Sequence, residues 1–413
     1  MSLFCGIDWG ERQHDVAVVD DAGVVRARAR IGNDACGLQA LLALLADLGD
    51  SPAAAIRVAI ETPRGLLVAC LRGTGRPVFA VNPLAVSRYR DRHAVAGAKS
   101  DRGDALVLAH LLRTDMAQHR PLPADSEHAQ AVAVLARAQQ DAVWDRQQLV
   151  NRVRCLLLEY FPAALEAFAG CSHGGLARAD ARAVLAAAPT PTLAAALTPS
   201  RLRAVLVRAG RTRRMDPAVE RLRRIFAAAQ MRHLPAVEAA MGRQLQALVG
   251  QLDAACTAET ELATAIEDVF GSHPHARVLT SFPGVGTIIG ARLLGEIGDD
   301  PTRFSDARAL KRYAGAAPIT KASGRMKTVR VRRVKNQRLA ATGYVWAFAA
   351  LRPSPGARRH YDARRRHGDT HTAALRHLWN RLLGCLHHCL RTHRTYQEHE
   401  AFPQTESHTT TAA

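Results

Sequence analysis

The first 81 residues constrain the fold most, because three short apolar segments precede the first helical stretch. Leu3–Ile7, Val16–Val19 and Val24–Arg30 have the pattern of strands, and Asp20-Asp21-Ala22-Gly23 has the composition of a tight hairpin turn. Helices and strands then alternate, at Gly37–Leu48, Ile56–Ile60, Arg64–Arg72 and Val78–Val81. Asn82-Pro83 ends the last strand and starts a helical connection. Strands that alternate with helices after an opening hairpin predict a mixed α/β sheet.

The middle of the chain has a helical composition. Residues 125–168, rich in Ala, Gln, Arg and Leu, predict one long helix. Residues 170–217 contain many Gly and Pro and predict short helices and loops. A second long helix is predicted over 218–268, interrupted near Pro235. Two long helices around an irregular segment fit an antiparallel coiled-coil arm, and they fit an ordinary helical bundle equally well.

Residues 278–298 predict a helix-hairpin-helix, with the turn at Pro283-Gly284-Val285-Gly286. Gly284 and Gly286 would let backbone amides at the start of the second helix approach a phosphate. Such a hairpin contacts the nucleic-acid backbone without reading sequence. A plain helical turn is the alternative.

These patterns divide the chain into four predicted regions. They are an α/β domain (1–120), a helical or coiled-coil arm (121–268), a mainly helical C-terminal domain with the helix-hairpin-helix (269–355), and a basic helical tail with a disordered end (356–413).

The charge of the chain indicates a polyanionic partner. Its 413 residues carry a formal net charge of +19, from 56 Lys+Arg against 37 Asp+Glu. Residues 1–120 hold 15 basic and 13 acidic residues, whereas 301–400 hold 22 and 5. Nucleic acid is therefore expected along the last quarter of the chain.

Neither a membrane nor a disulfide framework is indicated. No apolar run reaches the roughly 20 residues that a membrane span needs. The eight cysteines are scattered and form no CxxC pair. The chain is expected to be soluble and intracellular.

Four acidic residues lie where predicted elements begin or end. Asp8 and Glu61 each end a strand, and Asp101 and Asp104 lie three residues apart at the start of a helix. Such carboxylates can hold two Mg²⁺ ions (or Mn²⁺) about 3.5–4 Å apart, which suits phosphoryl transfer. Taken singly, each acid has a structural alternative, such as capping the helix or ending a strand in solvent.

The order Asp, Glu, Asp-x-x-Asp on a hairpin-led sheet resembles the RuvC-like branch of the ribonuclease H fold. More closely, the chain resembles the DEDD-type insertion-sequence transposases, the group that includes the Piv/MooV invertases. The resemblance rests on the N-terminal region and on a set of later blocks: Lys99–Ala109, Phe282–Gly286, Arg303–Ser305, Tyr313–Pro318 and Ser323-Gly324. It implies that Asp8, Glu61, Asp101 and Asp104 are catalytic metal ligands. Glu61 is followed by Thr-Pro-Arg-Gly, where the family more commonly has Thr-Gly.

The resemblance also implies a nucleophilic serine, which here is Ser323. Flanking basic residues would hold a scissile phosphate and neutralise its charge. The basic residues expected to contact nucleic acid are Lys321, Arg325, Lys327, Arg330, Arg332 and Arg333. Attack by the serine would give a phosphoserine–DNA intermediate. Read from the residues alone, Ser323-Gly324 is also compatible with a flexible turn in a phosphate-contacting loop.

Further partners follow from the resemblance. It implies element-end and target DNA, a non-coding bridge RNA, and a composite active site in a dimer or tetramer within the bacterial cytoplasm, at the nucleoid. Two rival functions remain open: a hydrolytic RuvC-like junction nuclease that uses only the acids, and a non-enzymatic nucleic-acid-binding protein.

Overall fold

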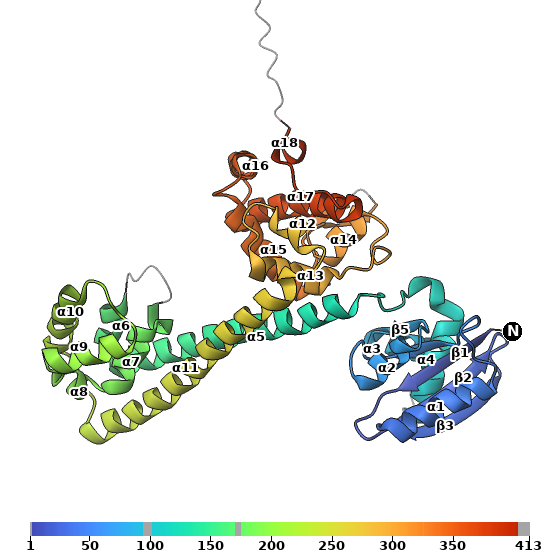
Figure 1. Ribbon diagram of the computed structural model, residues 1–413, viewed down its shortest axis with the longest axis horizontal. Coiled ribbons are helices and arrows are strands. Elements are labelled where there is room, and N and C mark those ends of the chain that lie inside the picture. Colours follow the sequence, from blue (N-terminus) through green and yellow to red (C-terminus); the bar gives the residue numbers. More distant parts are fainter. Residues whose placement is uncertain (1, 94–100, 170–174, 325, 404–413) are drawn as a thin grey trace, which may run out of the picture. The chain divides into compact units, whose positions relative to one another are not determined.

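The computed structural model describes residues 2–93, 101–169, 175–324 and 326–403 (Figure 1). The chain divides into two compact units, Met1–Ala124 and Asp125–Ala413. Within the described ranges, the structure has no helix that is both long enough and apolar enough to cross a membrane.

The first unit is a mixed α/β domain, and it contains every strand that the sequence predicts for this region. Its elements are β1 (Leu3–Asp8), β2 (Gln13–Asp20), β3 (Val25–Gly32), α1 (Ala35–Asp47), β4 (Arg57–Ile60), α2 (Leu66–Gly73), β5 (Val78–Ala80), α3 (Pro83–His93), α4 (Asp101–Asp115) and a 3-10 turn (Met116–Gln118).

The sheet of this unit has the strand order β3-β2-β1-β4-β5. The opening strands β1, β2 and β3 are antiparallel, whereas β1, β4 and β5 are parallel. This arrangement confirms the predicted mixed sheet and places β1 at its centre.

Helices cover both faces of the sheet. Leu41 and Leu45 of α1 and Leu71 of α2 pack on one face, and Leu108 and Leu112 of α4 pack with α3 on the other. Burial on both faces explains the continuous apolar runs of β1 and β4, whereas the edge strand β3 alternates exposed arginines with half-buried alanines.

The second unit is almost entirely helical. Its elements are α5 (Glu127–Tyr160), α6 (Pro162–Phe168), a 3-10 turn (Gly175–Ala177), α7 (Ala179–Ala187), α8 (Pro191–Ala195), α9 (Pro199–Arg208), α10 (Met215–Ala227), α11 (Pro235–Gly271), α12 (Ala276–Thr280), α13 (Thr287–Ile297), α14 (Ala307–Tyr313), β6 (Ile319–Ser323), β7 (Met326–Arg330), α15 (Gln337–Ala350), α16 (Pro355–Arg366), α17 (His371–Thr392) and α18 (Glu398–Ala401).

The long helices α5 and α11 lie side by side and antiparallel. Near the start of α5, the ring of His128 bonds to the carbonyl of Val269 near the end of α11, and farther along Arg146 pairs with Glu259. The single helix predicted over 125–168 is wrong at its end. Phe161 leaves helical geometry, and Pro162 starts α6, since proline lacks the N–H that a continuing helix needs.

Two apolar cores lie at opposite ends of this helix pair. One joins the start of α5 and the end of α11 to helices α12–α18, and the other joins the opposite ends to α6–α10. The predicted boundary at residue 355 falls inside the first core, because Ala357 of α16 and Leu375, Leu378 and Leu382 of α17 pack in it. The basic residues of these helices occupy their outer faces. They dominate the composition of this segment, so the apolar stripe that packs in the core is not evident from composition alone.

Candidate active site and serine hairpin

Asp8 and Glu61 follow paired residues of neighbouring parallel strands. Ile7 of β1 pairs with Ile60 of β4, so the two acids take the next position on each strand. Both residues are half-buried. Neighbouring strands lie about 4.8 Å apart, and the two acids therefore leave the sheet at adjacent positions on the same edge.

A glycine allows α4 to reach this edge. An added Cβ at Gly6 would lie 2.0 Å from the carbonyl oxygen of Ala105 and 2.4 Å from the amide nitrogen of Ala109, so α4 packs directly on the backbone of β1. Asp104 immediately precedes Ala105 and is buried. Its Oδ1 forms an ion pair with Arg90 of α3. Asp101 begins α4 one turn earlier, and its side chain lies outside the described residues.

The chemistry of these residues suits a hard divalent cation, because their donor atoms are all carboxylate oxygens. Among the side chains that the structure describes, no three Asp, Glu, His or Cys residues form a group that could hold a metal ion.

A buried histidine, which the sequence analysis does not single out, holds the loop after Asp8. His14 is fully buried, and its Nδ1 accepts a hydrogen bond of 3.3 Å from the backbone N–H of Gly10. Its ring also stacks on Trp9, with 6.4 Å between centroids. In the sequence, the one feature that could have drawn attention to His14 is a histidine at the start of an apolar strand.

Ser323 is the last residue of β6 and lies at the tip of a two-stranded hairpin. It pairs with Met326 across the turn, and Gly324 has a φ of +54°, which favours glycine at this position. Ser323 is exposed. The hairpin thus presents a hydroxyl group to solvent at its tip, where a large ligand can reach it.

The register of the hairpin shows which of the predicted basic positions share a face with Ser323. Position 321 shares a strand face with Ser323, and Arg330 pairs with Ile319 on that same face, whereas position 327 falls on the other face. Arg330 and Arg333 are exposed, and Arg332 is half-buried. Residue 325 and the side chains of Lys321 and Lys327 lie outside the described residues.

A polar network closes the base of the hairpin segment. The backbone N–H of Asn336 donates to the carbonyl of Tyr313 (2.9 Å), and its side chain donates to the Tyr313 hydroxyl (2.7 Å) and to Glu296 (2.6 Å). Arg137 of α5 forms an ion pair with the same Glu296 at 2.7 Å. Residues 314–335, with Ser323 in their middle, therefore form a loop whose two ends are fastened to each other and to the core.

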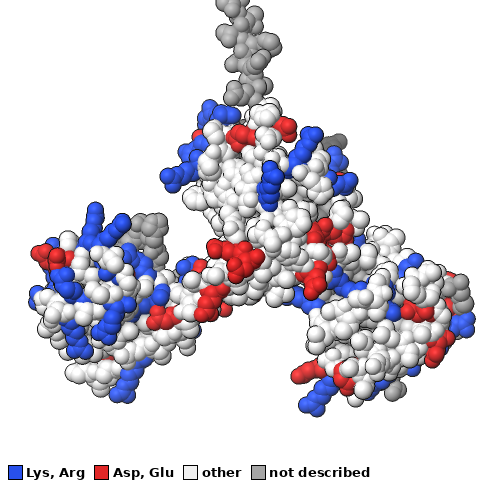
Figure 2. All heavy atoms as spheres, viewed as in Figure 1, with Lys and Arg blue, Asp and Glu red and all other residues white. Residues whose placement is uncertain are grey.

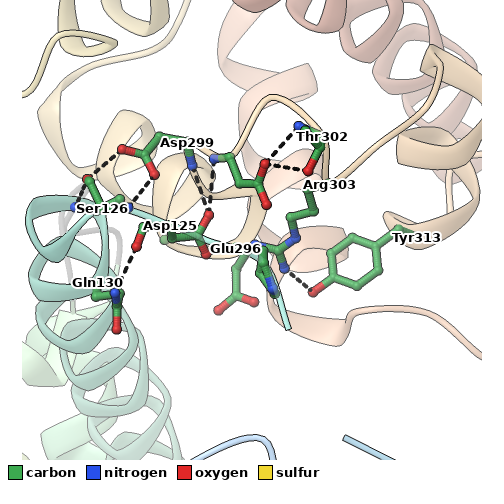
Figure 3. A network of polar contacts seen from close by, with 12 residues as sticks. Asp125, Ser126, Gln130, Glu296, Asp299, Thr302, Arg303 and Tyr313 are labelled. Carbon is green, nitrogen blue, oxygen red and sulfur yellow. Dashed lines mark hydrogen bonds and ion pairs between the residues drawn. The ribbon is translucent and has the colours of Figure 1, made fainter. Parts of the chain in front are cut away.

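Figure 3 shows how this network continues to the start of α5. Arg303 donates to the Tyr313 hydroxyl (3.2 Å) and pairs with Asp125, whose Oδ1 accepts from the amides of Asp299 and Asp300. Although burial acts to raise it, the pKa of Asp299 is lowered because Ser126 and His273 donate to its carboxylate. These contacts hold the segments around Arg303 and Tyr313, and with them the base of the serine hairpin, against the start of α5.

The predicted hairpin turn joins α12 to α13, but its two glycines differ. Gly284 has a φ of +76°, and an added Cβ would lie 2.7 Å from the backbone of Ala349 and Ala350 in α15. The indole of Trp346 also donates to the carbonyl of Pro283 (3.0 Å). Gly284 is therefore required for packing, whereas Gly286 is exposed and has open space around it.

Comparison with known proteins decides the family. Residues 5–162 match the DEDD transposase family of IS110, and residues 276–362 match the transposase family IS116/IS110/IS902. The chain is 61% identical to the "Mini-circle putative transposase for IS117" of Streptomyces coelicolor, over 97% of both chains. It belongs to the IS110 family of transposases. It is also 30% identical to the "Insertion element IS900 uncharacterized 42 kDa protein" of Mycobacterium paratuberculosis, over 95% of this chain and 97% of that one.

The two IS110-family matches coincide with the two candidate sites. The first contains the sheet, α3 and α4, and the second contains the turn before α13 and the serine hairpin. Among solved structures, T. thermophilus RuvC in complex with a Holliday junction substrate matches 30% of this chain and all of its own, at 17% identity and a TM-score of 0.22.

Proposed function

We propose that this IS110-family transposase cleaves and exchanges DNA strands through a covalent bond between Ser323 and DNA, with Mg²⁺ held by Asp8, Glu61, Asp101 and Asp104. The observation that carries the proposal is the pairing of Ile7 with Ile60, which makes Asp8 and Glu61 neighbours at the edge where α4 brings Asp104.

The carboxylates have one task in this scheme. Bound Mg²⁺ would neutralise charge on the scissile phosphate and stabilise the leaving oxygen. Asp8 and Glu61 would orient it from the sheet edge, and Asp104 from the helix. Arg90, through its ion pair, fixes the rotamer of Asp104 and offsets the cost of burying that charge.

Ser323 supplies the nucleophile. Its Oγ forms a bond to phosphorus while the bond from phosphorus to one deoxyribose oxygen breaks. The departing oxygen takes up a proton and leaves as a hydroxyl, and the serine proton passes to solvent. A hydroxyl of a second DNA strand then attacks the phosphoserine in the reverse sense, which joins the strands without loss of bond energy. Exposure at a hairpin tip supports this role.

The acids and the serine belong to different units of the chain. We propose that a composite site forms between protomers of a dimer or tetramer, and that a bridge RNA pairs with the donor and target DNA. Exposed Arg330, Arg333 and Gly286 would contact phosphates, as would Lys321, Arg325, Lys327 and Arg332. The enzyme would act at the nucleoid, in the bacterial cytoplasm.

The test uses the full chain, Mg²⁺, the non-coding RNA of the element and labelled element-end DNA. The proposal predicts a protein–DNA adduct that resists denaturation and disappears on chelation of Mg²⁺. Free nicked DNA without an adduct would support a hydrolytic nuclease, and retention of intact DNA would support a binding protein. Either result contradicts the proposal.

A further inference from the structure

A second basic region lies far from the serine hairpin, in the module formed by α6–α10 and the first turns of α11 (the distal module). Residues 199–243 hold 11 arginines and 3 acidic residues, whereas 244–300 hold 2 basic and 8 acidic residues. A codon preference for arginine does not explain this contrast between adjacent segments. Figure 2 shows the basic side chains gathered over the distal module on the face in view.

Three of the five acids in the distal module are already paired, and the other two, Glu166 and Glu220, are exposed without an ion pair among the described residues. Asp216 pairs with Arg203, Glu238 with Arg232, and Asp180 with both Arg178 and Arg211. Seven further arginines are exposed and form no ion pair with any acid that the structure describes: Arg201, Arg208, Arg213, Arg214, Arg223, Arg224 and Arg243. Glu166 and Glu220 can offset at most two of these seven charges, so the distal module keeps a positively charged surface.

Packing does not require these arginines. The apolar side chains of α9 and α10, such as Leu202, Leu206, Leu222 and Phe226, fill the interior and leave the arginines on the outer faces. A cluster of like charges on a helical surface is destabilising by itself. Its presence on a well-packed module points to an anionic partner.

The composition of this surface indicates which kind of nucleic acid it binds. Phe226 is the one Phe, Trp or Tyr between residues 199 and 243, and it is buried, so this surface offers no aromatic platform for stacking unpaired bases. Arginine forks without stacking residues suit the phosphates of a double helix. Because the chain is a DNA transposase, we propose that the distal module binds the backbone of duplex DNA, without sequence preference. This function is additional to cleavage.

The long helices set the spacing between the two nucleic-acid surfaces. On α5, Ala136 belongs to the core under the serine hairpin and Val153 to the core of the distal module. These 17 residues correspond to about 25 Å at 1.5 Å per residue. The two cores are thus separated along α5 by the length of about seven base pairs at 3.4 Å each, which suits a distal module that holds DNA outside the segment being cleaved.

The experiment measures binding of the full chain to a duplex DNA of arbitrary sequence, about 60 base pairs long, with a chelator present so that no cleavage occurs. The variant is Arg208→Gln with Arg223→Gln, on α9 and α10. The matched control is Arg28→Gln with Arg57→Gln, two arginines of the first unit without an ion pair among the described residues. A third protein, with Arg208→Lys and Arg223→Lys, keeps the charge.

Loss of two phosphate contacts should make the slope of the logarithm of the binding constant against the logarithm of the salt concentration less negative by about 1.8. Binding should weaken roughly fiftyfold at about 0.1 M salt. The control and the lysine protein should stay close to wild type. An unchanged slope in the glutamine variant would overturn the proposal, and so would an equal loss in the lysine variant. A slope change seen with duplex RNA and absent with duplex DNA would also overturn it. Since cleavage is not measured, failure here is separable from failure of the serine mechanism.

Discussion

Single residues set the geometry of the acidic site. Gly6 lets the backbone of α4 touch β1, and the buried Asp104 forms an ion pair with Arg90 of α3. Asp8 takes its position from the end of a strand in the centre of the sheet. Each of these features lies within the first unit.

Replacement of the carboxylates should separate chemistry from folding. Asp8→Asn and Asp104→Asn keep side-chain shape but remove the charge that attracts Mg²⁺, so each should lower strand cleavage far more than tenfold, with 1.4 kcal/mol marking each factor of ten. Asp91→Asn, an exposed acid on α3, is the control and should cleave like wild type. Gel quantification of cleaved DNA checks this. Retention of more than about a tenth of the activity by Asp8→Asn would remove Asp8 from the site.

The positions of the four candidate acids at strand ends and at a helix start could be predicted from the sequence, because these are local signals. The contacts that Arg90 makes with Asp104 and His14 makes with Gly10 could not be predicted from the sequence. An arginine 14 positions before Asp104, and a histidine inside an apolar strand, acquire their partners only when the elements pack.

At the scale of elements, the serine hairpin depends on its base. Asn336 fastens the segment to Tyr313 and Glu296, and its side chain also caps α15 by accepting from the amide of Leu339. The family resemblance predicts a role for Ser323, but the sequence could not predict the pairing of Asn336 with Tyr313, since nothing local links residues 313 and 336.

Asn336→Ala should therefore loosen the hairpin. Loss of the cap and of two side-chain hydrogen bonds should reduce stability by about 1–3 kcal/mol. It should also speed proteolytic cleavage at the arginines of the hairpin segment. Gln337→Ala, its exposed neighbour, is the control. Equal proteolysis rates in the two variants would show that Asn336 does not hold the hairpin.

The distal module contains an ion pair with a predictable pH dependence. Arg232 donates to both carboxylate oxygens of Glu238, and this outweighs burial, so with help from Thr192 the pKa of Glu238 falls from 4.5 to about 2. Because the folded-state pKa is depressed, the stabilisation is complete above the unfolded value of 4.5 and is lost as the pH falls toward 2.

Glu238→Gln should accordingly unfold at a lower temperature than wild type at neutral pH, by an amount equal to about 1–2 kcal/mol after allowance for the exposed partner. The gap should close as the pH falls from about 4.5 to about 2. Thermal unfolding across this range measures it. A gap that is constant with pH would mean that the effect comes from packing and not from the charge.

At the scale of the whole molecule, composition predicted a polyanionic partner but placed the basic residues that would bind it only in the last quarter of the chain. Counting charge in the last quarter of the chain hid the second excess at residues 199–243, because the acidic stretch 244–300 offsets it. Composition also favoured a boundary at residue 355, because the arginines and histidines of α16 and α17 outnumber the apolar residues by which these helices pack in the same core as α12–α15.

The division into two units leads to a complementation test. If acids from one protomer act with the serine of another, a mixture of inactive Asp8→Asn protein and inactive Ser323→Ala protein should recover part of the wild-type exchange. Recovery is expected because some assemblies would contain one intact composite site. The strand-exchange yield of the mixture is compared with that of each variant alone. A mixture as inactive as its components would show that each chain uses its own acids and serine.

The most direct measurement locates the protein–DNA bond itself. Full-length protein is incubated with Mg²⁺, the element's RNA and element-end DNA, then digested, and the peptide that carries a nucleotide is sequenced by mass spectrometry. We expect the modification on Ser323, its complete loss in Ser323→Ala, and its persistence in Thr320→Ala, which removes a neighbouring exposed hydroxyl from the same strand. Normal strand exchange by Ser323→Ala, without an adduct, would contradict the serine mechanism and leave the four carboxylates to act on water.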